Sequence, residues 1–412
     1  MFLGLPRRFV RATTLTLLIA FVTVPFIGLP YSADDTVNRN WPQAGWIDGV
    51  SEAWRLQRTW MFEQGRFFPG GSVYALVMWN AFQSRAAYMT YLALLSVLIA
   101  VLIAYVVWRL TRSAMLGAFA AVTFTACLQL RFGYLDGVAS FAGLVGYTLA
   151  LTLIAGLIAA HILRGGSHWW VILVAVAWSL AITAYEVSLL MLPAILLLLW
   201  ATGPSLRDRA RWAWATLPLI VPAALALGVT FYLRRRELPL APAYQVDLSG
   251  PVASTFGKQF TAALPFSQQG IAGAPIFTGL SILLALVLAV PAFLAWRPWG
   301  REPHLVGGRV NASLLAAGVW AWVVPSALAA VTVRWQTELI WGQGYIYLPY
   351  EFAGFTLVMT GIAGAVRAHV PRPWARVALG VFFGAMVIAC ALTAGVNIVN
   401  VGTIVPGAQG PG

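Results

Sequence analysis

Two adjacent aspartates near the amino terminus are the strongest candidates for catalysis in this chain. Asp34 and Asp35 follow directly after the first long apolar segment, residues 13–29. Because neighbouring carboxylates repel each other, the pKa of one of them can rise toward the working range of a general base. A solvated loop start or a helix cap would use the same dipeptide, so the residues alone leave both interpretations open.

A second acidic position, Asp136, lies in the short polar segment 131–137. Its carboxylate could belong to a divalent-ion site together with Asp34 and Asp35. An ion pair with Arg131 or a helix cap is the alternative. Any metal held by these carboxylates would be Mg²⁺ or Mn²⁺, which prefer oxygen ligands. No cofactor is certain, since phosphate-binding loops and dinucleotide fingerprints are absent from the sequence.

Tyr185 and Glu186 interrupt the apolar run 169–203 near its middle. The run is long for one membrane span and short for two, which predicts a tight hairpin of two short or tilted helices. An ionisable group inside such a run is a candidate functional residue. Burying it unpaired would cost several kcal/mol. We therefore expect Glu186 to face the same cavity as Asp34 and to pair with an outer-loop arginine or a substrate hydroxyl, unless it is only a satisfied carboxylate at the hairpin tip.

The elements that must position these residues are membrane-spanning helices. Of the 412 residues 60% are hydrophobic and 9% are charged, against roughly 25% charged residues in a soluble domain. This composition excludes both a disordered chain and a soluble enzyme. The net charge of +13 does not indicate nucleic-acid binding, because arginines mostly occupy short gaps between apolar runs.

The basic residues at both ends of the apolar stretches predict the topology. Basic residues flank the apolar stretches on what we take to be the cytoplasmic side, so each intervening stretch must cross twice. The result is an all-α polytopic bundle of about 11 spans with a cytoplasmic amino terminus. Residues 1–412 form a single transmembrane domain without a separate soluble domain. Residues 31–85 and 234–275 are external loops, and only Asp208 and Glu302 among the 13 acids are cytoplasmic.

The first external loop contains a predicted helix at the membrane interface. Ser51 is a suitable N-cap and Gly65 a suitable stop. Ala53, Leu56 and Trp60 would share its apolar face, as in helices that lie in the interface plane.

The order of these features resembles the GT-C superfamily of membrane glycosyltransferases. Asp34 and Asp35 after the first span, the interfacial helix, and then Gln64-Gly-Arg-Phe-Phe-Pro69 carry the resemblance, which covers residues 13–69. It implies transfer of a sugar from a polyprenyl-phosphate donor to an acceptor hydroxyl of a glycan, a lipid or a cell-envelope polymer. It further implies a bacterial plasma membrane with the active site on the external face, and Asp34 as the base with Asp35 second. Asp136 resembles a further acidic site residue of the family, which would bind a divalent ion with Asp34 and Asp35 or orient the acceptor.

A phosphate-bearing donor would need cations near the outer leaflet. The candidate substrate-binding residues, besides Asp136, Tyr185 and Glu186, are Glu63, Arg66, Arg131, Arg234, Arg235 and Arg236. The three consecutive arginines could equally serve anionic lipid headgroups. The expected partners are thus the donor, a saccharide or lipid acceptor and membrane lipids.

A transporter, flippase or polymerase of lipid-linked saccharides is the alternative function. A transporter should carry charged residues near the bilayer midplane and broken helices in corresponding halves. The predicted topology instead places most acids at the outer face, which favours an enzyme.

Overall fold

Apolar helices account for most of the computed structural model, which describes residues 7–31, 35, 45–131, 136–139, 141–204, 208–235, 245–265, 267–268, 283 and 306–403. Within these ranges there is no β-strand, only an isolated bridge between Val246 and Thr332. The prediction of an all-α chain of apolar helices is confirmed for these residues. Five helices are long and apolar enough to cross a bilayer, namely α5, α7, α10, α13 and α16.

The helices follow the predicted spans closely. Helix α1 (Arg7–Thr23) continues as η1 (Val24–Gly28), and the expected break near 131–136 separates α6 from α7. The remaining bundle helices are α5 (Arg85–Thr111), α6 (Ala114–Cys127), α7 (Leu144–Leu163), α8 (Trp170–Ala184), η4 (Glu186–Met191), α9 (Leu192–Thr202), α10 (Arg209–Arg235), α13 (Gly308–Ala330), α15 (Leu348–His369) and α16 (Arg372–Thr403). The span expected before residue 296 lies outside the described residues, so the number 11 stays a prediction.

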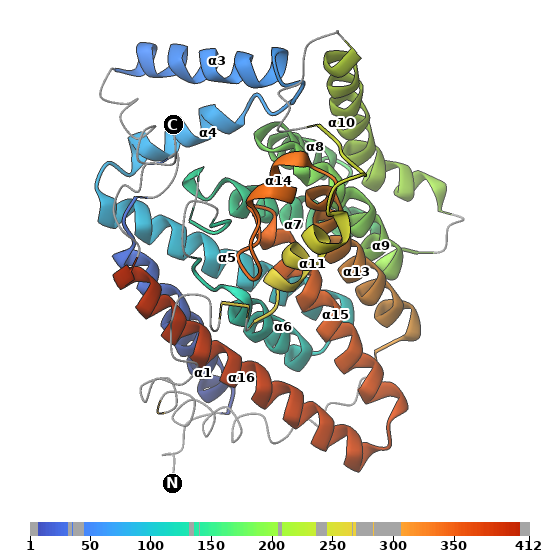
Figure 1. Ribbon diagram of the computed structural model, residues 1–412. Coiled ribbons are helices and arrows are strands. Elements are labelled where there is room, and N and C mark those ends of the chain that lie inside the picture. The colour runs from blue at the N-terminus through green and yellow to red at the C-terminus, as the bar shows by residue number, and fades with distance from the viewer. Residues whose placement is uncertain are drawn as a thin grey trace.

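The first loop contains two helices, α3 (Trp46–Phe62) and α4 (Gly71–Ala81), which lie across the top of the molecule in Figure 1. The prediction that Ser51 caps α3 is wrong, because the helix begins five residues earlier, after Gly45 at φ +91°. Asp48 then lies in the first turn, where a carboxylate favours the positive end of the helix dipole. Gly65 does stop the helix: at φ +62° it turns the chain so that Arg66 N donates to Trp60 O at 3.1 Å.

The face of α3 that packs on α4 differs from the predicted face of Ala53, Leu56 and Trp60. Ala53, Gln57 and Met61 are buried, whereas Leu56 and Trp60 are only half-buried. Ser72 Oγ of α4 donates to Gln57 Oε1 at 3.3 Å, and Trp54 and Ile47 are exposed. Whether α3 rests in the membrane interface stays a prediction.

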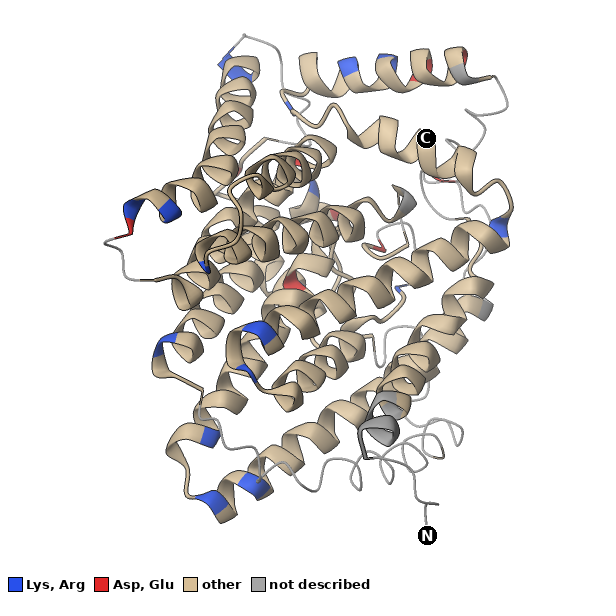
Figure 2. Ribbon diagram, turned by 180° about the vertical axis from the view of Figure 1, so that it is seen from behind, with Lys and Arg blue, Asp and Glu red and all other residues tan. Residues whose placement is uncertain are grey.

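The two ends of the bundle differ in charge. Figure 2 shows basic residues along the lower left border of the bundle, besides others at the top on α3 and at the upper end of α10. This basic end is formed by the turns from α5 to α6, α7 to α8, α9 to α10 and α15 to α16, and contains Arg109, Arg112, Arg164, Arg209, Arg211, Arg367 and Arg372. Neighbouring turns touch there, since Arg164 Nη2 donates to Arg109 O at 3.1 Å. The opposite end, called the loop end below, carries α3, α4, the short helices α11 (Val252–Ala262) and α14 (Val333–Glu338), and the α8–η4 tip.

Asparagines of α16 satisfy the backbone where α6 unwinds. Asn397 Oδ1 accepts from Leu130 N at 2.7 Å, and its Nδ2 donates to Leu128 O at 3.0 Å. The same Nδ2 donates to Val22 O at 2.9 Å, which ties in the end of α1. In a membrane protein such non-helical backbone is tolerated only where protein groups satisfy it.

Replacing Asn397 with Leu should therefore lower stability strongly. The substitution leaves the Leu130 N–H and the Leu128 and Val22 carbonyls without this partner, and a loss of about 3 kcal/mol is expected at ~1 kcal/mol or more per buried group. Thermal denaturation of the purified protein in detergent measures it. Ile398→Ala, at a neighbouring position that is 42% exposed, is the control. Equal melting temperatures for the two variants would contradict the proposed role of Asn397.

Candidate functional site

An ion pair joins the first loop to the α8–η4 tip at the loop end. Arg66 Nε donates to Glu186 Oε1 at 2.6 Å, across 120 residues of sequence. The two side chains are only 12% and 21% exposed. The Arg66 guanidinium also lies over aromatic rings, 4.6 Å from the centroid of Phe68 and 5.2 Å from that of Trp60. The expectation that Glu186 pairs with an outer-loop arginine is met by Arg66.

Close backbone contact makes this pair possible. Gly70 N donates to Thr183 O at 2.7 Å, and a Cβ atom at Gly71 would lie 2.7 Å from Ala184 O. Only glycine at position 71 lets the loop approach the hairpin so closely. The tip itself is the predicted tight turn: α8 ends at Ala184 and a 3₁₀ segment begins at Glu186.

Tyrosine side chains pack around the Arg66–Glu186 pair. Tyr185 is 5% exposed, and its ring lies 6.3 Å from that of Tyr347, which in turn lies 4.9 Å from Tyr345. Burial opposes the charge of Arg66, but the Glu186 carboxylate more than offsets it, so the pKa of Arg66 lies well above its ordinary value. Burial raises the pKa of the Tyr185 phenol, which therefore stays protonated. The site is thus aromatic, partly dry and electrically balanced.

Asp35 is held inside the bundle. Its carboxylate is 1% exposed, and Tyr88 Oη donates to Oδ2 at 2.6 Å. Tyr88 lies in the first turn of α5, which Ser84 caps by accepting from Ala87 N at 3.2 Å. The phenol therefore has a fixed position from which it anchors the start of the first loop. Asp34 lies outside the described residues.

Helix α4 separates this pair from the Arg66–Glu186 pair. Its Gly71 end packs on Ala184, and its Ala81 end leads into the first turn of α5. Eleven helical residues span about 15 Å at 1.5 Å per residue. Between the two ends, Tyr74 stacks on Tyr147 at 4.2 Å. Asp35 and Glu186 are both at the loop end, yet they do not meet.

Asp136 and Arg131 serve the backbone. Both Asp136 oxygens accept main-chain hydrogens, Oδ2 from Arg131 N at 2.6 Å and Oδ1 from Val138 N and Ala139 N at 2.7 and 2.8 Å. Arg131 is fully buried, and its two terminal nitrogens donate to Gln129 O and Ala262 O, each at 2.7 Å. Asp136 thus holds the turn at residues 137–139, an arrangement that is neither a helix cap nor a salt bridge with Arg131. Within the described ranges no three His, Cys, Asp or Glu side chains gather into a possible metal site, and the two described candidate ligands already accept hydrogen bonds.

The remaining predicted binding residues are dispersed around the loop end. Arg234 Nε donates to Gly65 O at 3.3 Å, which places the end of α10 beside the Arg66 turn. The Arg235 guanidinium lies 4.3 Å from the centroid of the Phe231 ring and is exposed. Glu63 is exposed at the C-cap of α3. Arg236 lies outside the described residues.

No protein-family model and no curated protein matches this sequence. Among solved structures, this chain is similar to ArnT from Cupriavidus metallidurans bound to undecaprenyl phosphate, at 13% identity and a TM-score of 0.47, with 95% of this chain and 76% of that chain covered. The likeness concerns the course of the helices, and the roles of single residues come from this chain's own geometry.

Sequence reasoning missed two residues that organise the loop end. Glu351 is fully buried in the first turn of α15 and accepts from Gln259 Nε2 at 2.9 Å and Ser326 Oγ at 2.8 Å. It thereby joins α11, α13 and α15. An acid within the apolar run 345–366 is the same signal that identified Glu186, and it could have been found. Tyr88, by contrast, has no sequence signal beyond its place in the first turn of a span.

Proposed function

We propose that this protein transfers a sugar from a polyprenyl-phosphate donor to an acceptor hydroxyl at the loop end, on the external face of a bacterial plasma membrane. The observation that carries the proposal is the Tyr88–Asp35 hydrogen bond, 2.6 Å long and buried. It ties the two-aspartate segment to the mouth of the bundle, beside membrane-length helices. A carboxylate there can act on a lipid-linked substrate while the polyprenyl tail of that substrate stays in the membrane.

The two aspartates would then have different tasks. Asp35 already accepts the Tyr88 hydrogen bond and is buried, so it positions the segment. Asp34 would take the proton from the acceptor hydroxyl, whose oxygen attacks the anomeric carbon. The bond from that carbon to the phosphate oxygen breaks, and polyprenyl phosphate leaves with the electron pair. Cations near the leaving group would stabilise the developing charge.

Charge balance indicates which arginines suit the phosphate. Arg66 is paired with Glu186 and walled by rings, so this neutral site suits the hydroxyls and apolar face of a sugar better than an anion. Arg235 forms no salt bridge with any described residue and is exposed. Arg234 and Arg235 at the end of α10 are therefore the proposed phosphate contacts.

Replacing Arg235 with Gln should raise the KM for the donor by about tenfold, because a charge-assisted phosphate contact contributes ~1.5–3 kcal/mol and part of it is screened at an exposed site. Arg235→Lys should recover only part of the loss if the contact is bidentate. Steady-state kinetics with a purified polyprenyl-phosphate sugar measure the effect. Arg58→Gln, at an exposed position of α3, is the matched charge control. The same donor KM in all three variants would assign Arg235 to the lipid surface.

The positions of the charges bear on the transporter alternative. The five membrane-length helices carry no acidic residue, and their arginines lie within the first five or the last three residues of each helix. A transporter would be expected to hold charged residues near the midplane. The decisive assay offers labelled donor and acceptor to the purified protein in detergent. The proposed enzyme releases polyprenyl phosphate, whereas a transporter leaves the donor intact.

Orientation has its own test. Single cysteines at Glu63 and Glu338 should react with an impermeant thiol reagent added to intact cells, while cysteines at Arg209 and Arg372 should not. Both native cysteines are buried, so they should contribute little background. Labelling of Arg209→Cys from outside would overturn the proposed topology, because it would place the basic end outside.

A further inference from the structure

A cavity of about 310 Å³ opens between α5, α7 and α9 at the basic end. It is remote from the proposed catalytic end: Tyr88 and Arg109 lie near opposite ends of α5, 21 residues apart, or about 30 Å at 1.5 Å per residue. That distance is the thickness of a bilayer core. The cavity therefore faces the other leaflet and plays no part in the proposed transfer.

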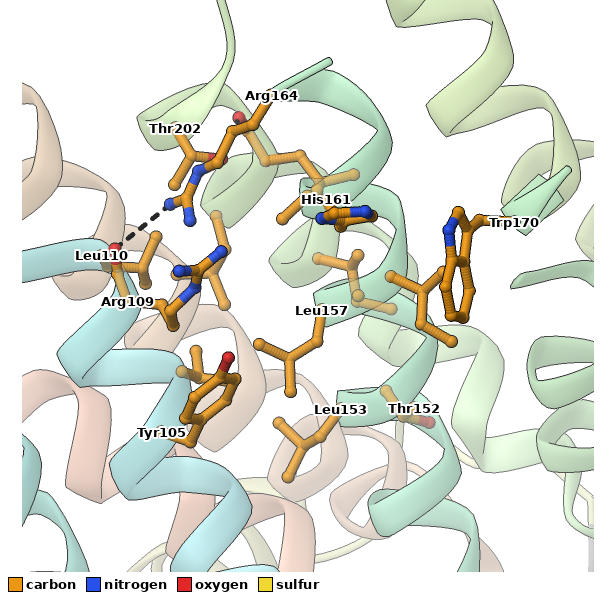
Figure 3. A pocket seen from close by; sticks show the side chains of 17 residues that line it. Tyr105, Arg109, Leu110, Thr152, Leu153, Leu157, His161, Arg164, Trp170 and Thr202 are labelled. Carbon is orange, nitrogen blue, oxygen red and sulfur yellow. Dashed lines mark hydrogen bonds between the residues drawn. The ribbon is translucent and has the colours of Figure 1, made fainter. Parts of the chain in front are cut away.

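Two arginines, Arg109 and Arg164, lie at the mouth of the cavity. In Figure 3 the guanidinium groups of Arg109 and Arg164 face each other above Leu153 and Leu157. Arg164 Nη2 donates to Arg109 O at 3.1 Å, and neither arginine forms a salt bridge with any residue that the structure describes. Burial and the nearby charges of Arg109 and Arg112 lower the pKa of Arg164. An anion between the two guanidinium groups would relieve this repulsion.

The interior of the cavity is apolar. Below the arginines the lining consists mainly of aliphatic side chains, including Val106, Leu153, Leu157, Ile195 and Leu198. Along α7 the lining extends from Thr152 to Arg164, about 18 Å at 1.5 Å per residue. A free anion would leave that length empty, whereas a molecule with an anionic head and a long apolar chain would fill both parts.

Exposed tryptophans place the mouth at the level of lipid headgroups. Trp108, Trp170 and Trp200 lie at this end of the bundle and are 38%, 41% and 39% exposed. Tryptophan is enriched at the membrane–water interface, where its ring lies among the headgroups. Basic pockets between helices on the cytoplasmic side are a recognised setting for phospholipid headgroups.

We propose that this cavity binds an anionic glycerophospholipid of the adjacent leaflet. Its phosphate lies between Arg109 and Arg164, and one acyl chain runs along Leu153 and Leu157. His161 and Thr202 at the rim, both lining residues, contact the glycerol side of the headgroup. The lipid neutralises the arginine pair and joins α5, α7 and α9 at the end opposite the proposed active site.

Native mass spectrometry of the full-length protein, extracted gently from its membranes, tests the assignment. The wild type should retain a glycerophospholipid, and Arg109→Gln/Arg164→Gln should retain at least about tenfold less, given two lost charge-assisted contacts. Arg209→Gln/Arg372→Gln removes the same charge from exposed positions of the same end and should bind as the wild type does. Equal retention in both double variants, or a wild type without bound lipid, overturns the proposal.

Leu157→Trp provides a second route that keeps both arginines. The larger ring fills the chain-binding part of the cavity, so bound lipid should fall although the charge is unchanged. Wild-type protein in bilayers of phosphatidylcholine mixed equally with phosphatidylglycerol should also melt at a higher temperature than in phosphatidylcholine alone. That difference should vanish in Leu157→Trp. Retention of polyprenyl phosphate instead of a glycerophospholipid would refute the proposed ligand, and an unchanged Leu157→Trp would refute the proposed cavity.

Discussion

Asp34→Asn is expected to lower the turnover number by about 10²–10⁴-fold, the usual contribution of a general base, while the protein keeps its fold. An amide cannot take the acceptor's proton at neutral pH. The substitution keeps size and shape, so donor binding should change little. The measurement is release of polyprenyl phosphate by purified protein at saturating donor and acceptor, alongside thermal denaturation.

Three companion variants make the result specific. Asp48→Asn removes an exposed carboxylate of the same loop from the first turn of α3 and should behave as the wild type. Asp35→Asn and Tyr88→Phe each disturb the buried 2.6 Å bond, so they should lower the melting temperature and reduce turnover less than Asp34→Asn does. If Asp34→Asn keeps wild-type turnover and Asp35→Asn is folded but inactive, then Asp35 is the base and Asp34 is not. Full activity in both aspartate variants would remove this site from the mechanism.

Glu186→Leu is expected to destabilise the protein by about 2 kcal/mol. Breaking a fully buried ion pair costs ~3–5 kcal/mol, and the residual exposure of Arg66 and Glu186 reduces that figure. Glu186→Gln retains an oxygen that can accept the Arg66 Nε hydrogen, so about 1 kcal/mol should be lost. Both variants should lower transfer activity, because the loop that carries Arg66 and Phe68 is no longer fixed to the tip of the α8–α9 hairpin.

A double-mutant cycle separates the pair from its surroundings. If the two groups interact directly, Arg66→Met/Glu186→Leu should be more stable than the sum of the single losses predicts, by about 1–3 kcal/mol. Activity should remain low, since a hydrophobic pair offers no hydrogen bonds to a sugar. Glu338→Gln is the control: it breaks a more exposed pair with Arg334, of 2.9 Å and 34% and 28% exposed, and should cost ~0.5 kcal/mol. A cycle that closes additively would show that the Arg66–Glu186 contact does not contribute to stability.

Local chemistry explains why much of the fold could be predicted. A bilayer selects segments by transfer free energy, which depends on the composition of each run, so α5, α7, α10, α13 and α16 fall on runs visible in the sequence. The hairpin of α8 and α9 was predictable because the apolar run 169–203 is long for one span and short for two. The pairing of Glu186 with a cation was likewise predictable from its position in an apolar run, because a buried carboxylate requires a partner.

Helix boundaries in the first loop were less predictable. Ser51 has good capping chemistry, but α3 already begins at Trp46. Its face of Ala53, Gln57 and Met61 packs on α4, and this tertiary contact supports a longer helix than one capped at Ser51. A single cap contributes ~1 kcal/mol, which packing along a helix readily exceeds.

The sequence by itself determined that this chain is an apolar helical membrane protein with polar chemistry gathered at one end. Only the tertiary structure decided which groups meet there. It selected Arg66, from several candidate cations, as the partner of Glu186 across 120 residues, assigned Asp136 to backbone hydrogens, and formed the Arg109–Arg164 cavity from three helices. The physical reason is that hydrophobicity acts on each segment separately, whereas an ion pair or a cavity exists only where distant segments approach within a few ångströms.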